Sequence, residues 1–115
     1  MAEPTRVCAL SELAEGECHL VGAAAAGWTD DIAVFRDGAD VYAVDDTCPH
    51  EEASLSEGWL EDGAIECPQH QSRFDLRSGK VLSAPATRDV TPHQVDIRDG
   101  AVWLTADRRP DGSAA

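Results

Sequence analysis

The stretch CPHEEASLSEGWLEDGAIECPQH, residues 48–70, contains two tight pairs of potential metal ligands. Cys48 and His50 flank a proline, and Cys67 and His70 enclose a Pro-Gln dipeptide. Proline stiffens a loop and removes a backbone donor, and each pair lies between strand-like runs. We therefore expect each pair at a loop tip, where two loops of a β-scaffold can bring all four side chains together.

The residues alone leave three interpretations of these pairs open. A zinc site accepts two thiolates and two imidazoles, but finger-like sites usually pair cysteine with cysteine and histidine with histidine. A 2Fe–2S cluster with mixed ligation places two cysteines on one iron and two histidines on the other. Chance placement is the third interpretation, and two tight pairs that each contain a proline argue against it.

Short apolar runs separated by turns extend along the rest of the chain. IAVFRDGADVYAVDD (residues 32–46) predicts a hairpin with Gly38 at its turn. TRVCAL (5–10), CHLVGA (18–23) and GAIECP (63–68) predict further strands, and SRFDLRSGKVLSAP (72–85) predicts strands that turn at RSGK. No long helical periodicity occurs. A small all-β sandwich or barrel is therefore expected.

Two further segments carry specific expectations. HQVDIRDGAVWLTA (residues 93–106) repeats the hairpin pattern, and alternation predicts four inward side chains. In ALSELAEGE (residues 9–17), Ser11 is expected to cap a helical turn that contains the apolar Leu13. The four predicted inward residues of the hairpin are Val95, Ile97, Val102 and Leu104.

Length and charge limit the classes of function. The 115 residues suit one domain, expected over 1–106, with a flexible tail at 107–115. A net charge of −13 argues against nucleic acid and anionic membranes as partners. No apolar run of transmembrane length and no signal-peptide pattern is present, so a cytoplasmic location is the simplest expectation.

The acidity is concentrated around the Cys/His pairs. Residues 45–66 contain no Lys or Arg. A local acidic surface of this kind favours a partner protein with a basic docking face. The acids in this segment are Asp45, Asp46, Glu51, Glu52, Glu57, Glu61, Asp62 and Glu66.

The spacing C-x-H followed by C-x₂-H resembles the ligand motif of Rieske 2Fe–2S proteins. The stretch CPQHQSRFDLRSGKVLSAPA (residues 67–86) strengthens the resemblance. In that family, C-P-x-H is followed by an aromatic residue, an acid and a turn that ends in G-K or G-R. Phe74, Asp75, Gly79 and Lys80 occupy these positions. The resemblance extends over nearly the whole chain.

The resemblance implies an antiparallel Rieske-type β-sandwich that binds one 2Fe–2S cluster through two ligand loops, within about residues 45–75. It implies that Cys48 and Cys67 bind the inner iron as thiolates. His50 and His70 would each bind the outer iron through one ring nitrogen, which makes the histidine edge the exit for an electron. Pro85 falls where the family has a proline-bearing loop over the cluster.

Several positions favour the soluble ferredoxin branch of the family over the respiratory-chain branch. Respiratory proteins join two further loop cysteines in a disulfide, and Ala53 and Gln69 stand at those positions. Ser72 occupies the position of a serine that faces the cluster sulfurs, whereas Phe74 replaces a tyrosine. Gln71 departs from a common glycine. The missing tyrosine hydroxyl and the local acids predict a reduction potential near the lower end of about −150 to +300 mV.

The implied function is that of an electron carrier with no substrate of its own. It would take single electrons from an NAD(P)H-dependent flavoprotein or ferredoxin reductase. It would pass them to a terminal Rieske oxygenase, such as a ring-hydroxylating dioxygenase. The alternatives are the small subunit of an NAD(P)H-dependent nitrite reductase and a zinc-binding structural module. The oxygenase itself needs a second domain with a mononuclear iron, for which 115 residues leave no room.

The remaining cysteines and histidines are expected to have no role in metal binding. Cys8 and Cys18 lie outside the motif and are expected to be buried free thiols in short strands. His19 and His93 have no cysteine at ligand spacing and are expected to be ordinary surface or strand residues.

The aspartates before the first ligand pair and the tryptophans are also expected to be structural. Asp45 and Asp46 are interpreted as turn formers. Trp28, Trp59 and Trp103 are expected to pack in the core or at its rim. Trp59 lies between the ligand pairs in the sequence, where it would shield the cluster.

Overall fold

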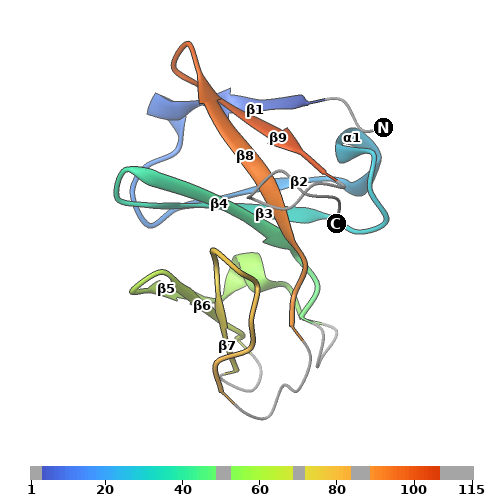
Figure 1. Ribbon diagram of the computed structural model, residues 1–115, viewed down its shortest axis with the longest axis vertical. Helices are drawn as coiled ribbons and strands as arrows, with labels where there is room; N and C mark the ends of the chain where they lie inside the picture. The colour runs from blue at the N-terminus through green and yellow to red at the C-terminus, as the bar shows by residue number, and fades with distance from the viewer. Residues whose placement is uncertain (1–3, 49–52, 69–71, 84–88, 107–115) are drawn as a thin grey trace.

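The computed structural model describes residues 4–48, 53–68, 72–83 and 89–106, and this part forms two antiparallel β-sheets with very little helix (Figure 1). The elements in chain order are β1 (Thr5–Ala9), the 3₁₀ turn η1 (Leu10–Glu12), β2 (Cys18–Val21), α1 (Ala23–Ala26), β3 (Ile32–Asp37), β4 (Asp40–Asp45), the 3₁₀ turn η2 (Leu55–Glu57), β5 (Trp59–Glu61), β6 (Ala64–Glu66), β7 (Arg73–Asp75), β8 (Pro92–Arg98) and β9 (Ala101–Thr105). The larger sheet has the order β1-β9-β8-β4-β3-β2, and the smaller sheet has the order β5-β6-β7. The predicted all-β class is confirmed.

The β3–β4 hairpin separates two apolar cores. Ile32 and Val34 of β3 pack into the core of the larger sheet. Ala33 and Phe35 pack into a second core, which the hairpin shares with the smaller sheet. A strand that is covered on both faces has a continuous apolar sequence, which explains the run IAVF. Gly38 forms the predicted turn with a φ of 64°, in the left-handed region that glycine tolerates.

The β8–β9 hairpin follows the predicted alternation only in part. Val102 and Leu104 are buried, and Val95 packs at the margin of the larger sheet's core. The prediction is wrong for Ile97, which is 45% exposed. Ile97 lies close to the Asp99–Gly100 turn, where the hairpin extends beyond the rest of the protein (Figure 1). Alternation predicts which face of the strand a side chain is on. It does not predict whether the core extends to that end of the strand.

The N-terminal turn forms differently from the prediction. Ser11 does not cap it; the carboxylate of Glu12 accepts a hydrogen bond from the backbone N–H of Ala9 at 2.8 Å. Leu13, expected within the turn, follows its last residue and is buried. The one-turn helix α1 was not predicted, and it ends at Gly27, whose φ of 68° is left-handed. A glycine after a helix commonly terminates it in this way.

The smaller sheet consists of three-residue strands joined by tight turns. Asp62 and Gly63 both have positive φ, at 51° and 74°, as a two-residue hairpin loop requires. In the predicted RSGK turn, Asp75 accepts hydrogen bonds from the N–H and the hydroxyl of Ser78. The strand expected after this turn is reduced to one bridge between Phe74 and Val81.

The predicted domain limits remain an expectation. Residues 107–115, the expected tail, lie outside the described residues. In the described ranges, no helix has the length and apolar character needed to cross a membrane.

Candidate metal centre

The structure brings the two predicted cysteine ligands into one core. Cys48 and Cys67 are 2% and 0% exposed, and both belong to the core that the β3–β4 hairpin shares with the smaller sheet. His50, His70 and Pro85 lie outside the described residues. Two loops that are distant in the sequence therefore place their cysteines in the same apolar environment, as the two-loop prediction requires.

The first ligand loop is closed by backbone hydrogen bonds at its base. The N–H of Cys48 donates to the carbonyl of Ala53 at 2.9 Å, and Thr47 and Ser54 form an antiparallel bridge. The N–H of Leu55 donates to the carbonyl of Asp46 at 2.7 Å. These bonds fix the two ends of the loop against each other on both sides of Cys48.

A buried carboxylate strengthens this closure. Asp46 is 6% exposed, and its side chain accepts hydrogen bonds from the hydroxyl of Ser54 at 2.6 Å and from the N–H of Ser56 at 2.9 Å. Asp30 accepts two more from the N–H and the hydroxyl of Thr47, at 3.1 and 2.9 Å. Hydrogen bonds to ionised acceptors are stronger than neutral ones. Asp46 therefore ties together the two ends of the loop, through residues eight and ten positions away, which differs from the local turn-forming role predicted for it.

The second ligand loop is closed in a similar way. The N–H of Cys67 donates to the carbonyl of Ser72 at 2.7 Å. Ser72 and Phe74 are both completely buried. The approach to this loop is tight, because a Cβ added to Gly58 would overlap the carbonyl oxygen of Glu66, the residue before Cys67. Any larger residue at position 58 would therefore require the backbone to shift.

The donor set fits a thiolate-bound metal. Deprotonated cysteine is the metal ligand, and soft thiolates select zinc and iron–sulfur clusters. A pair of thiols from two separate loops, buried in one core, supplies half of the ligands that either centre needs. The buried phenyl ring of Phe74 lies in the same core and carries no hydroxyl group.

A second polar cluster was missed by the sequence analysis. His93 is 1% exposed, and its Nε2 lies 2.7 Å from Oδ1 of Asp45. The same oxygen accepts a hydrogen bond from Nε1 of Trp28 at 2.8 Å, and the Trp28 and His93 rings meet edge to face. His93 is a strand residue as expected, but it is buried. The alternation of β8 continued back from Val95 would have placed it on the inward face.

The other structural interpretations have mixed outcomes. Cys8 and Cys18 are free, as predicted; Cys8 is buried and Cys18 is partly buried. Burial raises the pKa of the Cys18 thiol to about 12, and the nearby Asp46 carboxylate acts in the same direction. Trp103 is partly buried. The prediction is wrong for Trp59, which is 58% exposed and therefore packs in neither core.

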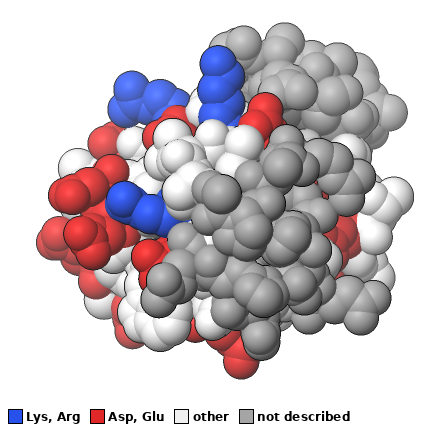
Figure 2. Space-filling model, turned by 90° about the horizontal axis from the view of Figure 1, so that it is seen from below, with Lys and Arg blue, Asp and Glu red and all other residues white. Residues whose placement is uncertain are grey.

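The acids of the 45–66 segment differ in exposure: Glu51 and Glu52 lie outside the described residues, and Glu66 is partly buried. Asp46 is buried and Asp45 is partly buried, and both accept the hydrogen bonds described above. Glu57, Glu61 and Asp62 are exposed. Figure 2 looks onto the end of the protein that carries the smaller sheet, and acidic side chains gather on one side of it. The acidic surface is thus associated with η2 and the β5–β6 hairpin.

Comparisons with known proteins agree on one family. The family model described as "Rieske [2Fe-2S] domain" matches residues 3–97. The 3-phenylpropionate/cinnamic acid dioxygenase ferredoxin subunit of Photorhabdus laumondii is 44% identical over 100 residues, which cover 86% of this chain and 90% of the relative. A chain in a solved complex of reduced oxygenase and oxidized ferredoxin in carbazole 1,9a-dioxygenase matches with a TM-score of 0.84 and 33% identity, over 97% of this chain and 95% of that chain.

The nitrite reductase alternative receives weaker support. A structure named as an NADH-dependent nitrite reductase small subunit from Mycobacterium tuberculosis matches with a TM-score of 0.77, over 90% of this chain and 95% of that chain. Its sequence identity is 22%. A likeness at this level shows the fold and does not extend to the function.

Proposed function

Because the chain belongs to the Rieske [2Fe-2S] domain family, we propose that it is a ferredoxin that serves an oxygenase system. It carries single electrons from an NAD(P)H-dependent reductase to a terminal oxygenase, such as a ring-hydroxylating dioxygenase. It has no substrate of its own. The observation that carries the proposal is the similarity to a dioxygenase ferredoxin subunit over 90% of that subunit's length.

The proposed cofactor is one Rieske 2Fe–2S cluster. Cys48 and Cys67 would hold one iron through thiolates, and His50 and His70 would hold the other through imidazole nitrogens. When bound, the cluster accepts and releases one electron. The part of this chain is to hold the two thiolates in a closed, apolar environment, which the hydrogen bonds at the bases of the two loops support.

The side chains beside the cysteines set the proposed reduction potential. Hydrogen bonds to cluster sulfurs raise the potential of such centres, and solvent exposure and negative charge also change it. Ser72 is proposed as one hydroxyl donor and Pro85 as part of a covering loop. Phe74 contributes no hydroxyl, so we expect a low potential for a Rieske centre. Phe74→Tyr should raise the midpoint potential in protein-film voltammetry.

The acidic surface is the proposed contact for both partners. Its exposed members, Glu57, Glu61 and Asp62, would steer a basic face of the reductase or the oxygenase toward the metal centre. Transfer rates should then fall as ionic strength rises; stopped-flow rates that do not change with salt would contradict this contact. The proposal also places the protein in the cytoplasm, without nucleic acid or membrane partners.

The experiment that tests the function is EPR of the dithionite-reduced protein, purified without added metal. Iron, zinc and labile sulfide are measured on the same sample. A rhombic signal with two irons per chain is expected for a cluster with mixed ligands. A colourless, EPR-silent protein with one zinc would overturn the electron-transfer function and leave a structural metal site.

A further inference from the structure

The outer face of the smaller sheet presents one continuous row of side chains. Trp59 of β5 pairs with Glu66 of β6, and Glu66 pairs with Arg73 of β7. Directly opposed residues of an antiparallel pair point to the same face. The next row, with Ile65 and Phe74, is buried in the core. The Trp59–Glu66–Arg73 row therefore faces away from the core.

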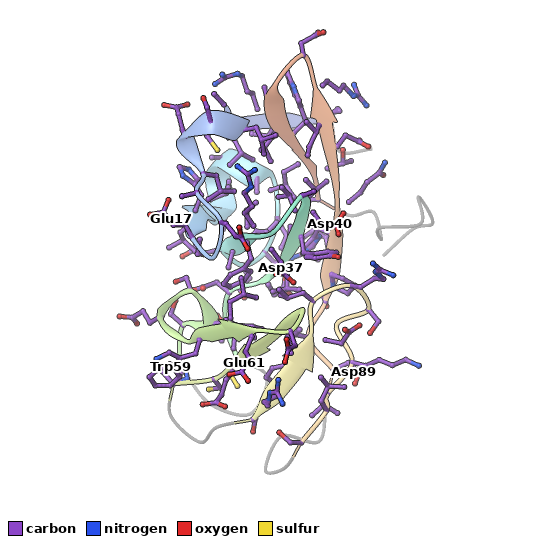
Figure 3. The ribbon with its side chains drawn as sticks, turned by 90° about the vertical axis from the view of Figure 1, so that its left-hand side faces the viewer. Glu17, Asp37, Asp40, Trp59, Glu61 and Asp89 are labelled. Atoms are coloured by element: carbon purple, nitrogen blue, oxygen red, sulfur yellow. The ribbon has the colours of Figure 1, made fainter. Side chains whose placement is uncertain are left out.

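Large apolar groups are exposed at both ends of this row. Trp59 is 58% exposed, and Figure 3 shows it at the outer edge of the protein on β5. Leu82, whose N–H donates to the carbonyl of Arg73, is 56% exposed. Tryptophan side chains are usually well buried in folded proteins. Tryptophan is also enriched among the interface residues that contribute most of the binding energy.

A hollow of about 390 Å³ lies against Trp59 and Glu66. In the ranges that the structure describes, the side chains of Trp59 and Glu66 make no hydrogen bond or ion pair. The Arg73 guanidinium lies at the other end of the row and approaches the carbonyl of Glu61 at 3.5 Å. The described residues that line the hollow are Trp59, Leu60, Glu61, Glu66 and Arg73.

The chemistry of this face fits a guanidinium group. The face of an indole ring attracts cations, and arginine more often than lysine makes this contact. Glu61 and Glu66 line the same hollow as Trp59, and a carboxylate can accept paired hydrogen bonds from a guanidinium. The net charge of −13 repels acidic partners. An arginine on a basic protein surface is therefore the favoured occupant.

The face is also close to the candidate metal centre. Glu66 immediately precedes Cys67, and Arg73 immediately follows Ser72. The hydrogen bond from Cys67 to Ser72 closes the loop between them. A protein that contacts Trp59 and Glu66 would consequently lie beside the second ligand loop.

We propose that the Trp59–Glu66 face is a docking site for an arginine side chain of a redox-partner protein. The proposal rests on the proposed function, because that function requires a redox partner. It adds the surface on which this partner binds. The arginine stacks on the Trp59 ring and pairs with Glu66, and it holds the partner beside the second ligand loop.

The test uses the oxidised holoprotein and the peptide acetyl-Gly-Arg-Gly-amide as the probe. NMR follows the indole N–H of Trp59 and the backbone N–H of Glu66 during titration. The same peptide with citrulline in place of arginine keeps the shape and removes the charge. Saturable shifts at both positions with the arginine peptide alone are expected. No saturable shift, or equal shifts with both peptides, would overturn the proposal.

Matched variants locate the site. Trp59→Ala and Glu66→Gln should each weaken the binding of the arginine peptide by about threefold to fivefold. Leu20→Ala and Glu15→Gln change an exposed leucine and an exposed glutamate elsewhere and should leave binding unchanged. Equal weakening in both sets would overturn the proposal. Iron and sulfide are measured on each sample: a full cluster without peptide binding counts against the docking site alone, whereas a missing cluster counts against the function.

Discussion

The two sheets reach stability by different means. In the larger sheet, strands such as β3 and β4 have six residues, and β8 has seven. These strands enclose an apolar core with Ile32, Val34, Val102 and Leu104. In the smaller sheet, each strand has three residues. Its only core in the described ranges is the one shared with the β3–β4 hairpin.

This difference indicates which half depends on a metal. A sheet of three-residue strands buries little apolar surface and is marginal by itself. Hydrogen bonds that join the two ends of each ligand loop, and those to the buried carboxylate of Asp46, add stability to this half. Metal binding adds to folding stability when the ligands come from separate segments. We therefore expect the larger sheet to tolerate loss of the cluster and the smaller sheet to lose order.

The largest expected effect separates the two halves directly. Cys67→Ser removes a proposed thiolate ligand and should abolish cluster binding, because serine is a poor ligand for this iron. Iron and sulfide analysis and visible absorption measure the loss. Amide hydrogen exchange should then accelerate in β5–β7 and remain slow in β3 and β4. Cys18→Ser is the matched control, since Cys18 lies outside the motif, and it should keep its full iron content.

Two outcomes would contradict this contrast. Full iron content in Cys67→Ser would remove Cys67 from the ligand set. Uniform acceleration of exchange in both sheets would show that the halves unfold as one unit, in which case the difference in strand length has no energetic meaning.

The next effect tests the tight approach beside the second ligand loop. A Cβ at Gly58 would overlap the carbonyl oxygen of Glu66, whereas at Gly22 nothing lies within 4 Å. Neither glycine has a positive φ, so the two differ in space and not in backbone strain. Gly58→Ala should lower the free energy of unfolding by about 3 kcal/mol. Gly22→Ala should change it by less than about 0.5 kcal/mol.

Urea denaturation of both variants measures these changes. Equal stability of Gly58→Ala and Gly22→Ala would mean that the smaller sheet yields readily to an added methyl group. The tight packing between η2 and β6 would then contribute little to the position of Cys67.

Sequence reasoning succeeds where a local pattern decides the structure. The two long hairpins, with turns at Gly38 and Gly100, follow from apolar β-type runs on both sides of a glycine turn. Cys48 and Cys67 are predicted as ligands from their pairing with histidine and proline; the structure brings both into one core, and their role as ligands stays a prediction. His50 and His70 remain predicted ligands.

Sequence reasoning fails where three-dimensional neighbours decide the structure. His93 is buried because Asp45 and Trp28, which are distant in the sequence, surround it. Trp59 is exposed because a three-residue strand has an outer face that no other element in the described ranges covers. The sequence predicts a surface or strand position for His93 and a core or rim position for Trp59, so it gives the burial of neither residue. The β5–β6 hairpin did have a local signal, the Asp62–Gly63 pair.

A smaller effect concerns the carboxylate at the base of the first ligand loop. Asp46→Ala removes the acceptor for Ser54 and Ser56 and should lower the free energy of unfolding by about 1–3 kcal/mol. Iron loss to a chelator should also be faster. Asp46→Asn keeps one acceptor oxygen and should recover part of the loss. Asp40→Ala, at an exposed position, is the control.

Chelator kinetics decide the role of Asp46. If Asp46→Ala loses iron as slowly as Asp40→Ala, the carboxylate stabilises the turn without holding the ligand loop. The closure of the loop would then depend on its backbone hydrogen bonds alone.

The smallest effect is a pH dependence that links the two halves through Cys18, a β2 residue that packs against the shared core. Burial, and then the Asp46 carboxylate, raises the pKa of this thiol from 9.0 to about 12 in the folded protein. The folded state therefore keeps the proton where the unfolded state has lost it. The contribution of this group is fully present below pH 9.0 and is lost as the pH rises toward about 12.

Urea denaturation between these pH values should show falling stability, with a shallower slope in Cys18→Ser, because the serine hydroxyl does not titrate there. Asp46→Asn should also make the slope shallower, since it removes the second cause of the raised pKa. Iodoacetamide should react slowly with native Cys18 at mildly alkaline pH, because the thiolate is the nucleophile. Rapid labelling of the folded protein would mean that the thiol is not held in the apolar environment between the sheets. The halves would then be energetically independent at this position.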